Sequence, residues 1–403
     1  MKMAMSRILR AAAAGLAWAL ASGAAEASDH LDSPAVIADP RIDIGDLYAW
    51  MAPDGAHLNV LMSIVGHSFS DTARYVFHFE SGPRFGQTRA RLALTCRFPS
   101  PAETDCRLSS GDHAIGDARD EAGLASRRRS FRVFAGMRND PFFNNVRGTR
   151  AAYQIAMDAI EGGLQADGAG CPALPATTSG ALLDAWRHTD GAPGRDFLAG
   201  WTPSVIAVSL DLLTAARGGP LLAVWASTEQ GRAQVDRAGR PLTGNALLGT
   251  LASAAVRDRM KEDWNGTIPQ RSARFAPLIA EGLAFYDGFD GCGNQWLADR
   301  AIADAHRYET LAALLADDRL WVNSAARVCT TLFAVERVAL GGEGALAVDC
   351  GGRAPTYDSV NVYRSLLVDG RTASVDDGVH RDEGGASDSA FPFAAAARQG
   401  DAY

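Results

Sequence analysis

An acidic stretch with one histidine stands where the mature chain is expected to begin. Residues 26–34 have the sequence Glu-Ala-Ser-Asp-His-Leu-Asp-Ser-Pro. If a signal peptidase cuts after Ala27, the new chain starts with Ser28, Asp29 and His30. A free amine, two backbone amides and the imidazole of a third residue together wrap a square-planar metal, the geometry that suits copper(II) or nickel(II). The spacing therefore predicts a copper or nickel site at these three residues, provided that the cut falls there.

The same histidine also fits a second kind of metal site, which needs no free amine. Asp29, His30 and Asp32 are followed by two further carboxylates, those of Asp43 and Asp46. Carboxylates with one imidazole suit calcium or a transition metal such as manganese, iron or zinc. The alternative is structural: the carboxylates cap turns and strand ends, and His30 bonds to the backbone. An acidic segment near the C-terminus is predicted to close over this group, with the carboxylates of Asp376, Asp377, Asp382 and Glu383.

A polar pair precedes two aromatic residues in the middle of the chain. Asn139 and Asp140 are followed by Pro141, Phe142 and Phe143. The favoured interpretation is a turn that seats the two phenyl rings in the core. The alternative is that Asn139 and Asp140 line a pocket near the N-terminal segment.

A second polar group lies within twelve residues of sequence. It contains His67, Ser70, Asp71 and His78. His78 has the same parity as Val76 in an alternating segment, so a single histidine facing the core is the favoured interpretation.

The common catalytic motifs are missing from the chain. It has no H-E-x-x-H zinc helix, no G-x-S-x-G nucleophile elbow and no G-x-x-x-x-G-K-[ST] phosphate loop. Residues 342–347 imitate a dinucleotide fingerprint, but strand-like residues follow them, so no nucleotide cofactor is predicted. We therefore expect a non-enzymatic binding protein. The alternatives are a structural or interaction module of the cell envelope, with an envelope protein as partner, and a hydrolase whose site is assembled from dispersed residues.

The first 27 residues have the three parts of a secretory signal. Lys2, Arg7 and Arg10 supply the positive charge, and residues 11–21 form an apolar, Ala-rich run. This run is too short to span a membrane well, although a retained anchor is the alternative. Small residues at Ala25 and Ala27 flank Glu26 at the spacing of a cleavage site. Because no second long apolar run follows, the chain is predicted to be periplasmic or secreted, with no membrane span after cleavage.

The charge of the chain argues against nucleic acid as a partner. The formal net charge is −8, and Arg supplies nearly all of the positive charge because Lys2 and Lys261 are the only lysines. Nucleic-acid phosphates require a positive protein face, which an acidic chain is poorly suited to provide. The scarcity of lysine together with abundant alanine is typical of a GC-rich genome. The sequence makes no prediction of the oligomeric state.

The six cysteines all follow the predicted signal peptide. An even number of cysteines in an exported chain indicates disulfides, and six cysteines allow fifteen pairings. Short separation favours Cys96–Cys106 and Cys329–Cys350, which leaves Cys171–Cys292. A thiolate metal site is the weaker alternative, because no C-x-x-C motif occurs.

Alternating, β-branched and aromatic residues predict strands over the first half of the chain and again near its end. Turn residues between the early segments favour a meandering antiparallel sheet. The predicted strands lie within residues 41–50, 56–66, 75–80, 90–98, 130–134, 205–213, 221–227, 331–348 and 360–368.

Helical periodicity replaces alternation between residue 245 and about residue 325. A shorter, weakly helical segment covers residues 151–160. We predict an α+β fold that is β-rich, with sandwich-like antiparallel sheets and an inserted helical layer at about residues 245–325. Residues 28–403 are expected to form a single domain, and a split into two domains near residue 245 is the alternative.

Several motifs, in order along the chain, resemble those of a known bacterial family. They are residues 29–34 (DHLDSP), 43–50 (DIGDLYAW), 53–55 (PDG), 134–143 (FAGMRNDPFF), 352–358 (GRAPTYD), 377–379 (DGV) and 391–393 (FPF). With these motifs the chain resembles the family named domain of unknown function 4331 over nearly the whole mature sequence. Many members have Ser-Ser-His-Arg-Glu-Ala-Pro where this chain has Ser-Asp-His-Leu-Asp-Ser-Pro. The resemblance implies an exported, β-rich protein, and it carries over no activity because none is agreed for the family.

Overall fold

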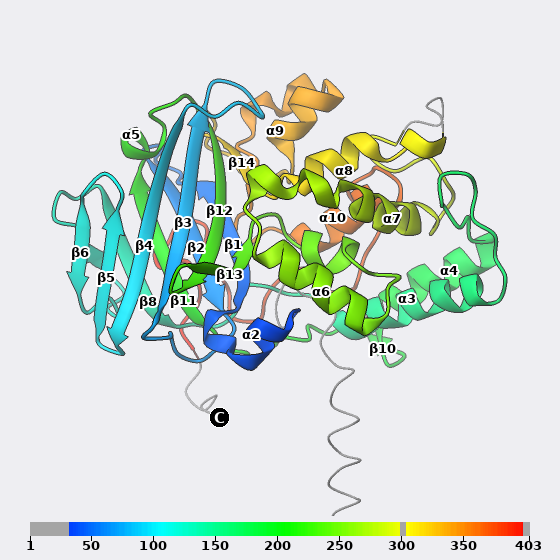
Figure 1. Ribbon diagram of the computed structural model, residues 1–403, viewed down its shortest axis with the longest axis horizontal. Coiled ribbons are helices and arrows are strands. Elements are labelled where there is room, and N and C mark those ends of the chain that lie inside the picture. The colour runs from blue at the N-terminus through cyan, green and yellow to red at the C-terminus, as the bar shows by residue number, and fades with distance from the viewer. Residues whose placement is uncertain (1–31, 299–303, 398–403) are drawn as a thin grey trace, which may run out of the picture.

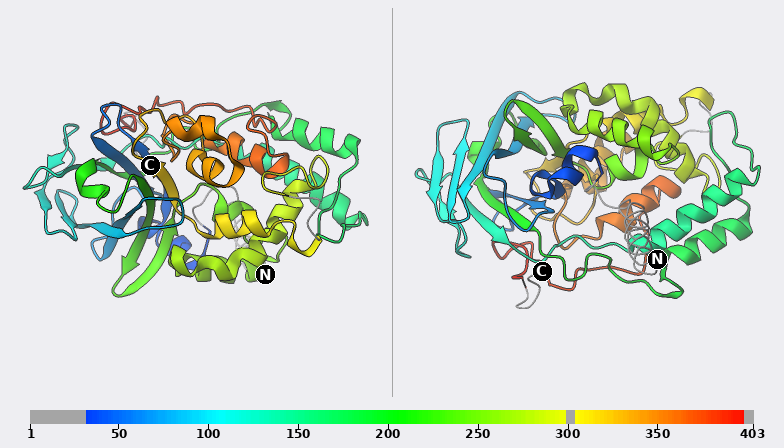
Figure 2. Two further views of the ribbon diagram at one scale, coloured as in Figure 1. Left: turned by 90° about the horizontal axis from the view of Figure 1, so that it is seen from above. Right: turned by 60° about the horizontal axis from the view of Figure 1, so that its bottom comes forward.

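The protein consists of a sheet half and a helical half (Figure 1). The computed structural model describes residues 32–298 and 304–397. Two antiparallel sheets lie face to face at one end, and the longer helices gather at the other end (Figure 2). Each half has a hydrophobic core of its own. The predicted α+β fold with sandwich-like sheets is therefore confirmed.

The first sheet has five strands in the order β1-β2-β11-β8-β7. Its pairs are all antiparallel, and the predicted turn at residues 53–55 joins β1 to β2. Every residue of β1 is buried. In a two-layer sandwich the outer face of this strand would be exposed, but here the helical half and the C-terminal chain, which pairs with Ala49 through Arg353, cover it. The strands are β1 (Ile44–Met51), β2 (His57–Ile64), β11 (Ser204–Asp211), β8 (Phe131–Met137) and β7 (Leu124–Ala125).

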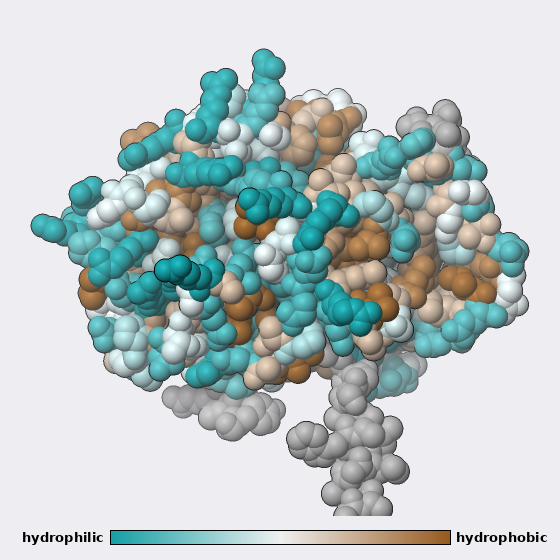
Figure 3. Space-filling model, viewed as in Figure 1, coloured by the Kyte–Doolittle hydropathy of each residue, from teal (hydrophilic) through white to brown (hydrophobic). Residues whose placement is uncertain are grey.

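The second sheet has the order β13-β12-β3-β4-β5-β6, and β14 also pairs with β12. Strand β4 shows why alternation predicted this sheet: Leu94 and Cys96 face the core, whereas Arg91 and Arg97 are exposed. The outer face of the sheet half is mostly hydrophilic (Figure 3). The strands are β13 (Ala233–Ala238), β12 (Leu221–Gln230), β3 (Ala73–Gly82), β4 (Ala90–Ser100), β5 (Glu103–Leu108), β6 (His113–Gly116) and β14 (Leu320–Asn323).

The helical half is assembled from several stretches of the chain. The predicted helical layer at about residues 245–325 contains α6 (Ala254–Asn265), α7 (Ala276–Asp287) and α8 (Glu309–Ala316). It is joined by three helices from outside that range: α3 (Val146–Glu161), α4 (Ala176–Trp186) and α10 (Ser359–Val368). Their shared core is rich in aromatic rings that meet edge to face, which adds to the stabilisation from burial alone. Among the helices that the structure describes, none has the length and hydropathy needed to cross a bilayer.

The remaining elements are short. A two-stranded ribbon pairs β9 (His188–Thr189) with β10 (Ala192–Pro193), and three brief α-helical turns are α2 (Pro34–Ala38), α5 (Leu212–Ala215) and α9 (Ala334–Glu336). Other helical turns are η1 (Pro40–Ile42), η2 (Thr243–Leu247), η3 (Pro269–Phe275), η4 (Asp304–His306), η5 (Arg337–Gly341) and η6 (Gly344–Val348).

Two strand predictions near the C-terminus are wrong. Residues 331–348 form the short helical turns α9, η5 and η6, and residues 360–368 belong to α10. Nearly every residue of α10 is buried, including the polar side chains of Asn361 and Arg364, so its sequence lacks the single apolar stripe of a surface helix. A short buried segment of this kind, with β-branched valines, does not distinguish a helix from a strand by its period. The side chain of Asp358 accepts a hydrogen bond from the backbone N–H of Asn361, which favours the helical start.

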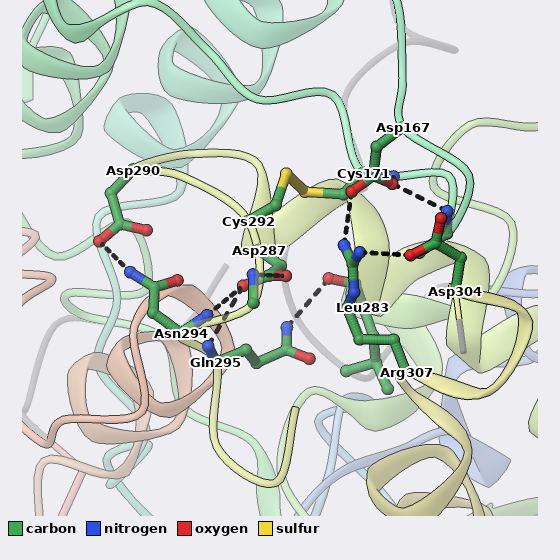
Figure 4. The surroundings of a disulfide bond; sticks show 12 residues. Asp167, Cys171, Leu283, Asp287, Asp290, Cys292, Asn294, Gln295, Asp304 and Arg307 are labelled. Carbon is green, nitrogen blue, oxygen red and sulfur yellow. Dashed lines mark hydrogen bonds and ion pairs between the residues drawn. A yellow bond between two sulfur atoms is a disulfide. The ribbon is translucent and has the colours of Figure 1, made fainter. Parts of the chain in front are cut away.

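The structure contains three disulfides, with the pairing favoured by the sequence. They are Cys96–Cys106, Cys171–Cys292 and Cys329–Cys350, and no free cysteine remains. The first lies between adjacent strands β4 and β5, and the second fastens the loop after α3 to the loop after α7 (Figure 4).

The chain after α10 runs back from the helical half to the sheet half without long helices or strands. We call residues 369–397 the C-terminal strap. The indole N–H of Trp50 donates to the carbonyl of Asp388, 2.8 Å away, and the N–H of Asn139 donates to the carbonyl of Ala395, 3.0 Å away. Phe393 packs edge to face on Trp50. These contacts hold the strap against the first sheet, at β1 and just after β8.

Removal of Cys171–Cys292 should destabilise the protein more than removal of Cys96–Cys106. The first bridge joins residues 121 positions apart, and the second joins residues 10 positions apart. A bridge that closes a longer loop restricts the unfolded chain more strongly, so we expect Cys171→Ala/Cys292→Ala to lose about 2 kcal/mol more than Cys96→Ala/Cys106→Ala. Equilibrium unfolding in urea measures both losses, and a larger loss for the short bridge would contradict this expectation.

Candidate functional site

The predicted copper or nickel site lies outside the described residues. Ser28, Asp29 and His30 all precede residue 32, where the description of the chain begins. This site therefore stays a prediction. The carboxylates assigned to the second kind of metal site are described from Asp32 onward.

Asp32 and Asp43 lie near a third buried carboxylate that the sequence did not single out. This is Asp236 of β13, whose carboxylate accepts a hydrogen bond from the N–H of Ile44, 2.7 Å away. All three aspartates are less than a tenth exposed. Burial raises the pKa of Asp236 well above its usual value, and the neighbouring charges of Asp43 and Asp32 raise it further.

One buried lysine lies beside Asp32. Lys261 of α6 is 2% exposed and contacts the side-chain oxygen of Asn245. Burial raises the pKa of Asp32, while the charge of Lys261 and a 3.1 Å hydrogen bond from Asn265 oppose that rise. The group therefore fixes the N-terminal segment against α6 and β13.

Asp46 has a different partner. Its carboxylate forms a 2.5 Å ion pair with Arg353, and both side chains are buried. The guanidinium of Arg353 also lies over the ring of Tyr48, 4.1 Å from its centroid, and donates to the carbonyl of Leu47. Asp46 is therefore part of a buried ion pair, whereas the structural alternative expected the carboxylates to cap turns and strand ends.

Asn139 and Asp140 lie close to this ion pair, under the C-terminal strap. Asp140 accepts a hydrogen bond from the N–H of Phe142 and is 4% exposed. Burial raises the pKa of Asp140 well above its usual value, and the charge of Asp46 adds to the effect. Phe142 and Phe143 are buried, as the favoured interpretation of this segment expected. The small void beside these rings and Arg353 has no room for a water molecule.

The acidic residues of the strap divide between the two halves. Burial raises the pKa of Tyr48, and the charge of Asp382 is among those that raise it further, so Asp382 lies near the Asp46 group. Asp377 instead accepts hydrogen bonds from the N–H of Asn145 and the side chain of Asn361 in the helical half. Of the acidic segment that was predicted to close over the N-terminal carboxylates, Asp382 thus approaches Asp46, whereas Asp377 does not.

Among residues 32–298 and 304–397, one group of three side chains places metal-ligand atoms within 4.8 Å of one another. It consists of Asp167, Cys171 and Cys292. Both sulfurs belong to a disulfide, and Asp167 forms a 2.5 Å ion pair with Arg307 (Figure 4). A disulfide sulfur is not a thiolate ligand, so this group acts as a structural staple for the two loops.

The most promising cavity lies at one end of the sandwich, and we call it the sandwich-end pocket. Its volume is about 580 Å³, and it is bordered by Arg41, His67, Phe69, Phe98, Arg119 and Met137. Phe69 and Phe98 stack with ring centroids 3.9 Å apart, which gives the pocket a flat aromatic wall. Met137 is 41% exposed, an unusual position for a large apolar side chain.

The polar groups of this pocket are almost balanced in charge. Arg41 pairs with Asp39 and Arg119 pairs with Asp117, while Asp71 also borders the cavity. His67 places Nδ1 2.9 Å from the carbonyl oxygen of Thr202. A carbonyl accepts only, so Nδ1 carries the proton and Nε2 of the neutral ring is left as an acceptor.

Sequence reasoning found only part of this site. His67 and Asp71 were grouped with Ser70 and His78, but His78 stacks on Trp225 and borders a different pocket. The N–H of Ser70 donates to the hydroxyl of Tyr75, a contact that stabilises the loop between β2 and β3. The walls of the pocket come from several separate loops and strand ends, which no local spacing connects.

The comparisons with known proteins give no further guide to the site. No family model, no curated protein and no solved structure matches the chain. The candidate sites are therefore assigned from geometry and chemistry alone.

Asp196 should make the protein less stable as the pH rises. It accepts hydrogen bonds from the N–H groups of Asn144 and Leu198 and faces acidic residues of the strap. Burial raises its pKa to about 7, above the unfolded value of about 3.9. The stability that the protonated form contributes is complete below about pH 4 and is lost as the pH rises through 7.

The variant Asp196→Asn, which stays neutral, should therefore match the parent at pH 4 and be more stable at pH 8. Thermal unfolding between these pH values measures the difference, with the exposed Asp71→Asn as control. Equal pH profiles for Asp196→Asn and the parent would rule out the raised pKa.

Proposed function

We propose that this chain is an exported binding protein whose ligand site is the sandwich-end pocket. The observation that carries the proposal is the pocket itself, with its aromatic wall, exposed Met137 and a histidine Nε2 available as an acceptor. Binding sites are typically concave and mostly apolar, with a few polar groups that orient the ligand. A volume of about 580 Å³ falls within the range of small-molecule sites.

The balance of charge in the pocket favours an uncharged ligand. Both guanidiniums already have carboxylate partners, so an additional anion would compete with Asp39 and Asp117. The Phe69–Phe98 stack favours a flat, apolar or aromatic ring. A single hydroxyl or amine on that ring would donate to Nε2 of His67.

Export is supported by the oxidised state of the cysteines. Three disulfides are compatible with a compartment outside the reducing cytoplasm. We propose the periplasm or the extracellular space as that compartment, after removal of residues 1–27. The resemblance to the family named domain of unknown function 4331 is in keeping with this location.

Filling the pocket should abolish binding of a neutral aromatic probe. N-phenyl-1-naphthylamine is fluorescent in apolar sites, so titration of the protein with it measures occupancy. We expect Ser68→Trp, which adds a large ring at the pocket border, to weaken binding at least tenfold. Ser110→Trp is the matched control, because Ser110 is equally exposed and does not border this pocket. Unchanged binding by Ser68→Trp would place the probe elsewhere and remove the proposal.

A metal site at Asp236 and its neighbour Asp43 is the second candidate, although the carboxylates of Asp32, Asp43 and Asp236 do not all lie within 4.8 Å of one another. The charges of Asp43 and Asp32 add to the effect of burial in raising the pKa of Asp236. A bound divalent cation would offset these charges, and oxygen ligands suit calcium or manganese. In the copper or nickel version, Ser28, Asp29 and His30 would supply the ligands.

Elemental analysis of protein purified from its native compartment distinguishes the two metal versions. Calcium or manganese that is lost in Asp236→Asn would support the carboxylate site. Copper or nickel that is lost in His30→Ala would support the N-terminal site. Metal-free protein that binds none of these ions in titration would eliminate both.

A further inference from the structure

A turn of three consecutive arginines joins β7 to β8. We call residues 126–130, Ser-Arg-Arg-Arg-Ser, the Arg turn. The N–H of Ser126 donates to the carbonyl of Phe131, and the N–H of Arg129 donates to the carbonyl of Ser126. Arg129 has a φ of 58°, in the left-handed region that a non-glycine residue seldom adopts. The backbone of the turn is thus held in a specific shape.

A buried carboxylate holds that shape. Asp112 is 3% exposed, and it accepts hydrogen bonds from the hydroxyls of Ser126 and Ser130, at 2.7 and 2.6 Å, and from the N–H of Arg128. Burial alone would raise the pKa of Asp112, but these hydrogen bonds keep it well below its usual value. Both carboxylate oxygens therefore serve the backbone and hydroxyls of the turn, and the guanidiniums are left to face solvent.

The Arg turn differs from several paired arginines of the sheet half. Arg127, Arg128 and Arg129 are exposed, and no ion pair of theirs occurs among the described residues. The same holds, within that part of the chain, for Arg132, whose guanidinium lies over the ring of Phe391, 4.1 Å from its centroid. By contrast, several neighbours are paired: Arg74 with Glu229, Arg107 with Asp105, Arg119 with Asp117 and Arg138 with Glu121.

A second cavity borders the Arg turn, and we call it the Arg-turn pocket. Its volume is about 480 Å³. Phe131 and Phe393 form its apolar part. Its polar border includes Arg129, Arg132, His57, Asn59, Ser130 and Ser209.

The Arg turn belongs to a stretch of the chain whose charge is positive, in contrast to the charge of the whole chain. Residues 84–138 contain eleven arginines and six acidic residues, whereas the chain has a formal net charge of −8. Like charges held together in a rigid turn repel one another. An anion bound in the adjacent cavity would offset this repulsion. The carboxylate at the border, that of Asp54, is already bound to His57 at 2.7 Å.

We propose that the Arg-turn pocket binds a phosphorylated sugar. A guanidinium matches the geometry of a phosphate and makes two parallel hydrogen bonds to it, which favours Arg129 and Arg132 as the phosphate ligands. The amide and hydroxyl groups of Asn59, Ser130 and Ser209 suit the hydroxyls of a sugar ring. The phenyl rings suit its apolar face. Arg127 and Arg128 raise the local positive potential and so attract the anion.

Titration calorimetry with glucose 6-phosphate, glucose and inorganic phosphate tests this proposal. We expect glucose 6-phosphate to bind at least tenfold more tightly than either glucose or phosphate, and to bind more weakly as salt increases. Arg129→Gln/Arg132→Gln should lose at least tenfold in affinity. Arg89→Gln/Arg97→Gln removes the same charge at exposed positions outside the pocket and should keep the affinity of the parent.

Blocking the cavity provides an independent variant that leaves the charge unchanged. Ser389→Trp, at an exposed position on the pocket border, should also weaken glucose 6-phosphate binding at least tenfold. The proposal is overturned if glucose 6-phosphate does not bind, if phosphate binds equally well, or if a short DNA duplex binds more tightly in the parent. Equal losses in the two arginine pairs would likewise overturn it, because they would show attraction to charge alone.

Discussion

The buried ion pair between Asp46 and Arg353 is the contact on which the union of the two halves depends. It ties β1 to the chain that leads into α10, and reciprocal backbone hydrogen bonds between Ala49 and Arg353 lie beside it. Arg353 also donates to the hydroxyl of Ser359 at the start of that helix. A buried charge without its partner is strongly unfavourable, by about 3–5 kcal/mol. The pair therefore fixes β1 against the segment that enters the helical half just before α10.

The buried region around this ion pair is closed to ligands, whereas the cavities of the molecule lie elsewhere. Asp46, Asp140 and Tyr48 have raised pKa values because they are buried together, and the void that Tyr48 borders is too small for water. Shifted pKa values often mark active sites, but here burial produces them and leaves a substrate no access. The open cavities lie instead at the borders of the sandwich, where loops and strand ends meet. Loops carried by a rigid scaffold commonly provide binding residues in this way.

The features that the sequence predicted well are local ones. Alternation in residues 90–98 located β4, and short separation indicated the Cys96–Cys106 bridge, because each depends on neighbours along the chain. The segment that forms α10 shows no single apolar stripe, because its polar residues are buried as well, so it was mistaken for a strand. Contacts between residues far apart in the sequence could not be predicted. Asp46 pairs with Arg353 about three hundred positions later, and Asp236 accepts a hydrogen bond from the N-terminal segment. The candidate pockets combine residues from several loops, and no spacing in the sequence brings those loops together.

The burial of Lys261 has a practical consequence for chemical labelling. Lys2 and Lys261 are the only lysines of the chain, and Lys261 is 2% exposed in its group with Asp32 and Asn245. A chain that begins at Ser28 would have two amines, the terminal α-amine and Lys261, and burial shields the second from an acylating dye. A single fluorophore or cross-linker could then be placed at the start of the native protein without mutagenesis. Slow additional acylation at Lys261 would report each opening of the N-terminal segment from α6.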